Sequence, residues 1–189
     1  MFYKSLQGPT LSYGQMNFII NFRNLWLDLA SWTRNYFVSI ISGYGNANMV
    51  GERLYRIPIE FHDRLQLVFG RENSEKIITL LSNHIILMMN LAISIKSGDN
   101  ELSSTLTNQL YQNVDELAAY FNSINPFWSN IQWKNLLDQY TRLTIEELVA
   151  LASGDFDKDI DIYDRITYHT LFLGDYMADG IMQYVEAKG

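Results

Sequence analysis

The side chains with the most chemical potential in this sequence are three histidines, His62, His84 and His169. Metal sites in helical bundles are built from histidines and carboxylates that project inward from facing helices. Oxygen ligands are available from Glu60, Asp63, Asp115, Glu116, Asp138, Glu146 and Asp175. The Glu-x-x-His spacing that places both ligands on one helix face is missing, because Glu60 lies two residues before His62. We therefore expect ordinary hydrogen-bonded histidines, with a transition-metal site at His62, His84 and His169 as the alternative.

A run of alternating aspartates from Asp155 to Asp161 resembles the start of a calcium-binding EF-hand loop. The glycine position of that loop is occupied by Ile160 and its bidentate glutamate position by Ile166, so its most demanding positions are unfilled. The aspartates are better explained as caps at the start of a helix, where the helix dipole favours acids.

Sequence templates of known catalytic sites are absent from the chain. There is no Walker A loop, no Gly-x-Gly-x-x-Gly, no Gly-x-Ser-x-Gly and no His-Glu-x-x-His. The adjacent carboxylates Glu146 and Glu147 face different directions on a helix, and we expect them on a solvated face. The lack of cysteine excludes disulfides, thiolate zinc sites, iron–sulfur clusters and cysteine nucleophiles. We therefore predict no catalytic residue and no cofactor.

The elements that would position these residues follow a helical pattern that is repeated three times. Apolar runs begin at residues 25–29, 80–84 and 136–140, offset by 55 and then 56 residues. A helix often ends at a glycine because the residue after its last turn adopts a left-handed conformation. Each run ends at such a residue, namely Gly43, Gly98 or Gly154. The pattern therefore indicates a helix, a glycine stop and a return helix, three times over.

The predicted helices span about 17–41, 48–69, 74–96, 100–121, 129–152 and 155–185, after an irregular lead-in at residues 1–15. Pro58 should kink or divide the second helix because proline removes a backbone donor, and Gly70 should end it. Ser129 and Gln132 fit a capping box at the start of the fifth. Short turns favour an all-α, six-helix up-and-down bundle of three hairpin repeats, each about 55 residues long. These repeats cover about 17–70, 74–124 and 129–187 of a single domain, 1–189, and stacked hairpin pairs are the alternative.

The composition limits the class of protein further. The net charge is −7 and Lys and Arg are scattered, so we predict no nucleic-acid partner. Residues 77–95 carry no charge and are long enough to span a membrane, but their Thr, Ser, Asn and His side chains are costly in lipid. We therefore predict a core helix surrounded by its neighbours and no membrane span. The missing cysteines and the absence of a signal-peptide pattern fit a cytoplasmic protein.

Aromatic and Met side chains are dense and helically spaced, which is typical of core packing. Such side chains can also line an apolar ligand cavity between helices or form the face of a homodimer. They are Trp26, Trp32, Tyr36, Phe37, Met88, Met89, Tyr120, Phe121, Phe127, Trp128, Trp133, Tyr176 and Met177.

Several segments resemble a group of uncharacterised all-helical proteins of spore-forming Firmicutes. The matching residues are Leu25-Trp26, Trp32-Thr33-Arg34, Ser123-Ile124-Asn125-Pro126-Phe127-Trp128 and Asp175-Tyr176-Met177. That group is similar in layout to ferritin-like metal-binding bundles, and some of its members carry enzyme names that their sequences do not support. The resemblance implies a histidine at the fifth residue of each leading-helix motif, where this chain has Leu29, His84 and Tyr140. A metal site of the group is therefore lost here, or it uses His62 and His169 instead.

Two functional hypotheses follow from these observations. The first is a non-enzymatic helical bundle that acts by protein association or by binding an apolar ligand, and its stability should be indifferent to chelators. The second is a ferritin-like metal protein that uses His84 with His62, His169 and nearby carboxylates. It predicts that His84→Ala removes a bound metal and leaves the fold intact.

Overall fold

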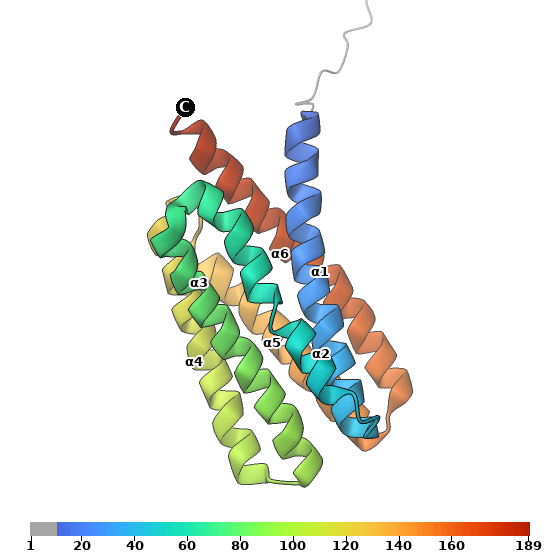
Figure 1. Cartoon of the computed structure of the whole chain (residues 1–189). Helices are drawn as coiled ribbons and strands as arrows, with labels where there is room; N and C mark the ends of the chain where they lie inside the picture. The colour runs from blue at the N-terminus through green and yellow to red at the C-terminus, as the bar shows by residue number, and fades with distance from the viewer. Residues whose placement is uncertain (1–10) are drawn as a thin grey trace, which may run out of the picture.

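The regular secondary structure of the described part of the chain, residues 11–189 of a computed structural model, is entirely α-helical (Figure 1). The helices are α1 (Tyr13–Ser42), α2 (Ala47–Leu54), α3 (Ile57–Ser97), α4 (Asn100–Ile124), α5 (Asn130–Ser153) and α6 (Phe156–Glu186). The predicted all-α class is therefore confirmed. Of the predicted irregular lead-in, residues 1–10 lie outside the described residues, and α1 already begins at Tyr13.

The first and last helices lie side by side (Figure 1). Helix α1 packs mainly against α6 and also contacts α2, α3 and α5. Helix α3 packs against α4, and α5 contacts both α4 and α6. Because α1 and α6 meet, the helices close into a bundle, whereas in stacked hairpins each repeat contacts only its neighbours.

Most of the predicted helix ends are confirmed. Gly43, Gly98 and Gly154 follow α1, α3 and α5 with left-handed φ values of 70°, 74° and 76°. The side chain of Asp99 caps α4 by accepting a hydrogen bond from the backbone of Leu102, and Asp155 caps α6 in the same way. At α5 only half of the predicted capping box forms, because Ser129 accepts from the backbone of Gln132 without a return bond. These ends depend on groups three or four residues apart, which the sequence shows directly.

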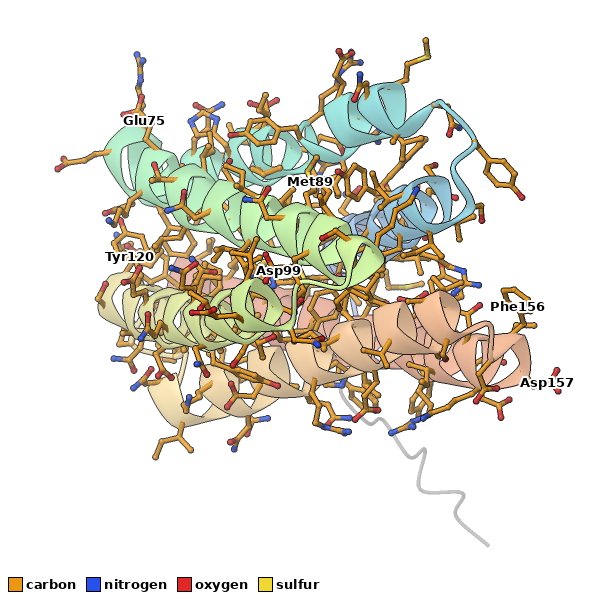
Figure 2. The ribbon with its side chains drawn as sticks, turned by 90° about the horizontal axis from the view of Figure 1, so that it is seen from below. Glu75, Met89, Asp99, Tyr120, Phe156 and Asp157 are labelled. Carbon is orange, nitrogen blue, oxygen red and sulfur yellow. The ribbon has the colours of Figure 1, made fainter. Side chains whose placement is uncertain are left out.

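The region between α1 and α4 follows the helices predicted at 48–69 and 74–96, with the first divided just before Pro58. The chain breaks between Leu54 and Ile57, so Pro58 lies in the first turn of α3, where its missing backbone donor has no helical acceptor to lose. Gly70 was predicted as a stop, and the helix is interrupted there, because Gly70 is non-helical at φ 79° and ψ 171° within the span labelled α3. The chain bends back on itself there, which gives α3 a short first arm (57–69) and a longer second arm (71–97) (Figures 1 and 2).

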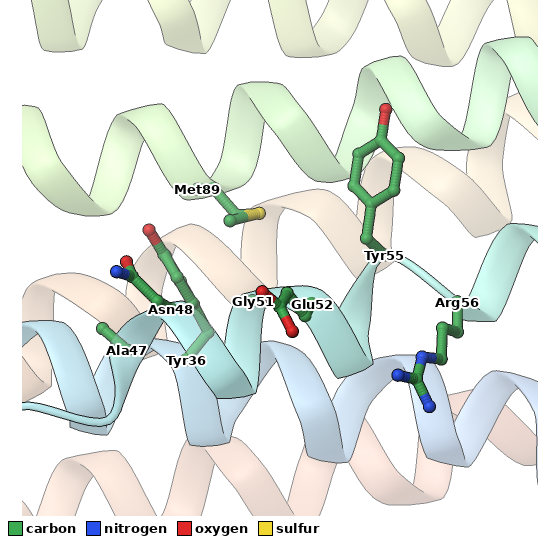
Figure 3. A pocket seen from close by; sticks show the side chains of 8 residues that line it. All are labelled: Tyr36, Ala47, Asn48, Gly51, Glu52, Tyr55, Arg56 and Met89. Carbon is green, nitrogen blue, oxygen red and sulfur yellow. The ribbon is translucent and has the colours of Figure 1, made fainter.

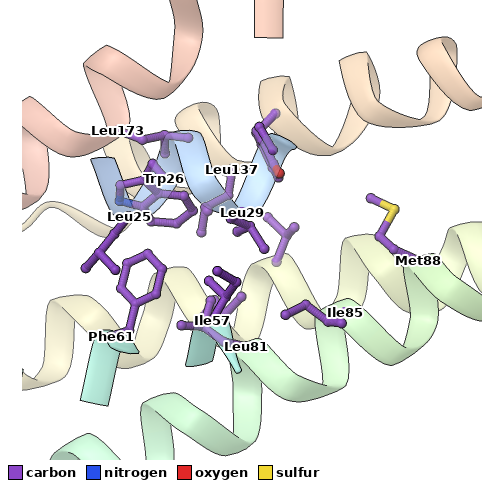
Figure 4. Close-up of a cluster of buried hydrophobic side chains, with 14 of the residues drawn as sticks. Leu25, Trp26, Leu29, Ile57, Phe61, Leu81, Ile85, Met88, Leu137 and Leu173 are labelled. Carbon is purple, nitrogen blue, oxygen red and sulfur yellow. The ribbon is translucent and has the colours of Figure 1, made fainter. Parts of the chain in front are cut away.

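The core is a continuous cluster to which all the helices contribute (Figure 4). Trp26 of α1 lies at its centre, with ring-centroid distances of 5.1 Å to Phe61 of α3 and 6.2 Å to Trp133 of α5. Full burial of a large apolar side chain contributes about 1.5–3 kcal/mol, so this cluster is the main source of stability. Core packing was predicted for the aromatic residues, and it is confirmed for Trp26, Trp128 and Trp133, which are all buried.

Two glycines allow close packing on α6. A Cβ at Gly174 would lie 2.6 Å from the backbone of Arg23, and one at Gly180 would lie 2.1 Å from the indole nitrogen of Trp128. The loop before α5 is also fixed here, because the side-chain amide of Asn125 donates to the Gly180 carbonyl at 2.9 Å. Helix α1 and this loop can therefore lie directly on the backbone of α6.

The most apolar helix is only partly covered. By length and composition, one helix in the described residues, Ala47–Ser97, could cross a membrane, and 56% of its most apolar window is buried. The helix predicted as a core helix is buried on the face that packs into the bundle, while Ile86 and Ile93 of the second arm of α3 face solvent. This uncovered face borders α2 and leads to the site described below.

Candidate functional site

The first predicted ligand, His84, is buried, and its side chain is hydrogen-bonded to Asn113. Its Nδ1 lies 3.0 Å from Oδ1 of Asn113 on α4, and the Asn113 amide nitrogen donates to the carbonyl of Leu80 at 3.1 Å. Since the amide nitrogen is used, its oxygen is the acceptor and His84 Nδ1 carries the proton. Burial lowers the pKa of His84 to about 4, with a small opposing effect from Asn113. The ring is therefore neutral at neutral pH.

The other two histidines make unrelated contacts. His169 Nε2 donates to the backbone carbonyl of Leu136 at 2.8 Å, and burial lowers the pKa of His169. His62 lies beside its neighbour Asp63, with Nδ1 3.2 Å from the carboxylate. The three predicted metal ligands are thus turned to three different partners.

The carboxylates predicted as oxygen ligands are also engaged elsewhere. Glu60, Asp115, Asp138, Glu146 and Asp175 each form an ion pair with an Arg or Lys side chain. Within residues 11–189, no group of three or more His, Asp or Glu side chains is placed to hold a metal ion. The residues present therefore do not fit a metal centre at His62, His84 and His169.

A buried ionic cluster connects α1, α5 and α6, and the sequence analysis missed it. Arg34 of α1 donates to both carboxylate oxygens of Asp159 on α6, at 2.5 and 2.6 Å, and also to Glu147 on α5. The carboxylates are 1% and 2% exposed. Glu147 was expected on a solvated face, and that expectation is wrong. Asp159 lies in the first turn of α6, as expected of a helix-start acid, but it is also buried against Arg34. The signal that could have found the cluster is Arg34, a lone base within the apolar run of α1.

The electrostatics of this cluster are unbalanced because one guanidinium serves two carboxylates. Removal from water raises the pKa of Glu147 to about 7, against the lowering effect of Arg34, and the charge of Asp159 adds to the rise. The hydrogen bonds to Asp159 raise the pKa of Arg34 above its ordinary value. Arg34 also stacks on Tyr163, with its Cζ 4.6 Å from the ring centroid. Such burial leaves no access for a substrate, and the arrangement is that of a structural network.

One accessible groove lies between α2 and the second arm of α3. It has a volume of about 610 Å³ and is lined by Tyr36, Ala47, Asn48, Gly51, Glu52, Tyr55, Arg56 and Met89 (Figure 3). Gly51 forms the base: a Cβ there would lie 2.9 Å from Cε of Met89 and 3.3 Å from the Tyr36 ring. These two side chains can therefore approach α2 only because residue 51 has no side chain.

The rim of this groove combines exposed polar and apolar side chains. Asn48, Glu52 and Arg56 are exposed along α2 and the short connection to α3. Tyr55 stands at the end of α2 beside the groove (Figure 3), and Met49, which follows Asn48 in the chain, is 75% exposed. The sequence analysis had identified Tyr36 and Met89 as candidates for core, cavity or dimer face. The sequence could not decide among these three roles for Tyr36 and Met89. The decision depends on the contact of both side chains with Gly51, which only the folded chain shows.

Charge is distributed unevenly along the chain. Residues 44–97, which carry α2 and α3, contain six Lys or Arg and five Asp or Glu. Residues 98–189, which carry α4, α5 and α6, contain five Lys or Arg and fifteen Asp or Glu. The groove therefore belongs to the nearly neutral part of an acidic protein.

Comparison with known proteins finds no matching family model, no similar curated protein and no similar solved structure. The resemblance to helical Firmicutes proteins and to ferritin-like bundles therefore stays a prediction.

Proposed function

We propose that the protein acts by protein association and that the groove between α2 and α3 binds a helix of its partner. The observation that carries this proposal is the apolar base formed by Tyr36, Gly51 and Met89 beneath an exposed rim. An interhelical groove with apolar anchors suits an amphipathic helix, whose side chains at i, i+3, i+4 and i+7 enter it. Methionine favours such contacts because its flexible thioether adapts to different shapes.

The rim defines the chemistry of the partner. Glu52 of α2 and Arg56 of the connection to α3 both line the groove and carry opposite charges. A partner helix is therefore expected to carry a basic and an acidic residue beside its apolar face. A small apolar ligand is less well matched, because the exposed polar rim would leave much of its surface in water. No observation favours the ferritin-like alternative, since its ligands do not converge.

Two further features accompany this proposal. The nearly equal spacing of Gly43, Gly98 and Gly154, at 55 and 56 residues, with each left-handed after a helix, supports an origin of the bundle in a hairpin repeated three times. A chain without cysteine suits a reducing compartment, which supports association in the cytoplasm.

The proposal is tested by NMR of the protein labelled at its methionine methyl groups. The probe is a designed amphipathic helix with Leu at i, i+3, i+4 and i+7 and mixed Glu and Lys on its other face. We expect the Met89 methyl resonance to shift with peptide concentration and the Met182 resonance on α6 to stay fixed. Tyr55→Glu on the groove rim should weaken binding about tenfold because it places a charge beside the apolar base.

The matched control is Tyr168→Glu, which changes an exposed tyrosine of α6, on the other side of the bundle, and should leave binding unchanged. A peptide that shifts Met182 and not Met89, or that binds Tyr55→Glu as tightly as the wild type, would contradict the proposal.

A further inference from the structure

We infer that the partner bound in the α2–α3 groove is a second copy of this chain, paired about a two-fold axis. In this dimer Glu52 of one copy faces Arg56 of the other, and Arg56 of the first faces Glu52 of the second. The inference rests on the proposed function and names its partner.

The charges on the rim are self-complementary. Glu52 and Arg56 are exposed, and neither has an ion-pair partner among the described residues, whereas the neighbouring Arg53 pairs with Glu60 at 3.0 Å. In a two-fold interface each surface meets a copy of itself in the opposite direction. An acid and a base that line the same groove then meet their opposites twice.

The overall charge disfavours part of the surface for contact between two copies. With fifteen acids against five bases, the part of the chain that carries α4, α5 and α6 repels a second copy. The part that carries α2 and α3 has five acids against six bases and does not. Like-charge repulsion therefore disfavours pairing through the acidic helices and leaves the groove face free to associate.

The shape of the face provides both a projection and a recess. Helix α2 lies at the outer edge of the bundle (Figure 2). Met49 of α2 follows the groove-lining Asn48 in the chain and is 75% exposed, and Ile93 of α3 is 49% exposed. In the two-fold arrangement Met49 of each copy enters the groove of the other and contacts Met89 and Tyr36. The apolar side chains that a single copy leaves in water are then buried.

The test is a charge exchange measured by sedimentation equilibrium at physiological salt. The wild-type chain should form a dimer. Glu52→Arg alone and Arg56→Glu alone should each weaken it about tenfold or more, since each places like charges opposite one another twice. The double variant Glu52→Arg/Arg56→Glu restores both pairs and should recover the dimer. An equimolar mixture of the two single variants should form a heterodimer, which native mass spectrometry detects by mass.

The matched control exchanges an exposed pair on α6, Asp164→Arg and Arg165→Glu, and should leave the dimer unchanged. A wild-type monomer at all concentrations overturns the inference, and so does a dimer that is indifferent to the single exchanges or one that the double exchange fails to restore. The Met89 shift with the designed peptide separates these failures from a failure of the proposed function. A monomer whose Met89 responds still has a groove for another protein, and one whose Met89 does not respond has neither.

Discussion

Two buried polar clusters hold this bundle together in different ways. The His84–Asn113 pair joins α3 to α4 and contains only neutral groups, and each amide atom of Asn113 has a partner. The Arg34–Glu147–Asp159 cluster joins α1 to α5 and α6 and contains three ionisable groups with one base for two acids. Both are buried between helices, so the difference between them is one of charge and not of location.

The two clusters also differ in the distance along the chain that they connect. His84 and Asn113 are 29 residues apart and hold consecutive helices together. Arg34 is 113 residues from Glu147 and 125 from Asp159, so the ionic cluster fixes the first helix against the last two. Buried charges contribute little net stability, yet a broken set is severely penalised. The ionic cluster, which is costly to break, therefore lies where the first helix must pack against the last two in a single arrangement.

The largest effect is expected from Arg34→Met, which leaves two carboxylates buried without their base. Removal of one partner from a buried ionic set costs about 3–5 kcal/mol. Urea unfolding followed by far-UV circular dichroism at pH 8 measures the loss. The triple variant Arg34→Met/Glu147→Leu/Asp159→Leu removes the charges together and should recover most of the stability. A single variant that is as stable as the wild type would show that the cluster is not desolvated.

The second prediction uses pH to separate the clusters. The folded chain holds a proton on Glu147 up to a pKa of about 7, against 4.5 ordinarily, so its contribution is lost as pH rises from 4.5 through 7. The pKa of His84 is lowered to about 4 from 6.5, so its contribution is present above 6.5 and is lost as pH falls toward 4. The two effects oppose each other between pH 4.5 and 6.5.

Single variants should expose these opposite slopes. Relative to the wild type, Glu147→Gln should gain stability as pH rises from 4.5 to 7, by up to about 3 kcal/mol. His84→Gln should instead gain stability relative to the wild type as pH falls from 6.5 to 4. Urea unfolding followed by tryptophan fluorescence at several pH values gives both slopes. If the stability of both variants, relative to the wild type, changed in the same direction with pH, the predicted opposition between Glu147 and His84 would be wrong.

A smaller loss is expected at the neutral cluster. Asn113→Leu leaves the His84 N–H and the Leu80 carbonyl without their buried partner, which costs about 1–3 kcal/mol. The double variant His84→Phe/Asn113→Leu removes both polar side chains and should be closer to the wild type than Asn113→Leu alone. Thermal unfolding of the three proteins at pH 7 measures the difference. A loss as large as that of Arg34→Met would mean that charge does not distinguish the clusters.

How far the sequence predicts this molecule depends on the distance over which each feature is determined. The caps at Asp99 and Asp155 and the left-handed glycines depend on residues within one turn, and they were predicted. Glu147 was assigned to a solvated face because it adjoins another carboxylate, Glu146, and Asp159 was explained only as an acid at the start of a helix. Their burial depends on Arg34, more than a hundred residues away, which no local pattern contains.

The candidate groove was unpredictable for a related reason. Pro58 was expected to kink or divide a helix, and the break before it sets α2 apart as a short separate helix. The groove requires in addition that Gly51 of α2 lie against Tyr36 and Met89, and only the fold brings these residues together. The predicted metal ligands failed in the opposite sense, since three histidines of suitable chemistry are turned to three separate partners.

The smallest predicted effect tests whether burial alone makes the ionic cluster strong. Arg23 and Asp175 join α1 to α6 with the same two-bonded geometry as Arg34 and Asp159, at 2.5 and 2.7 Å, but their side chains are 40% and 41% exposed. An exposed ion pair contributes about 0–1 kcal/mol to stability, so Asp175→Asn should lower the free energy of unfolding by at most about 1 kcal/mol. Raising the salt concentration should reduce the effect further, since solvent ions screen an exposed pair and not a buried one. Chemical unfolding of Asp175→Asn beside Arg34→Met, at low and high salt, makes the comparison. Equal losses in the two variants would mean that the two-bonded geometry, and not removal from water, determines how strongly α1 is held to α6.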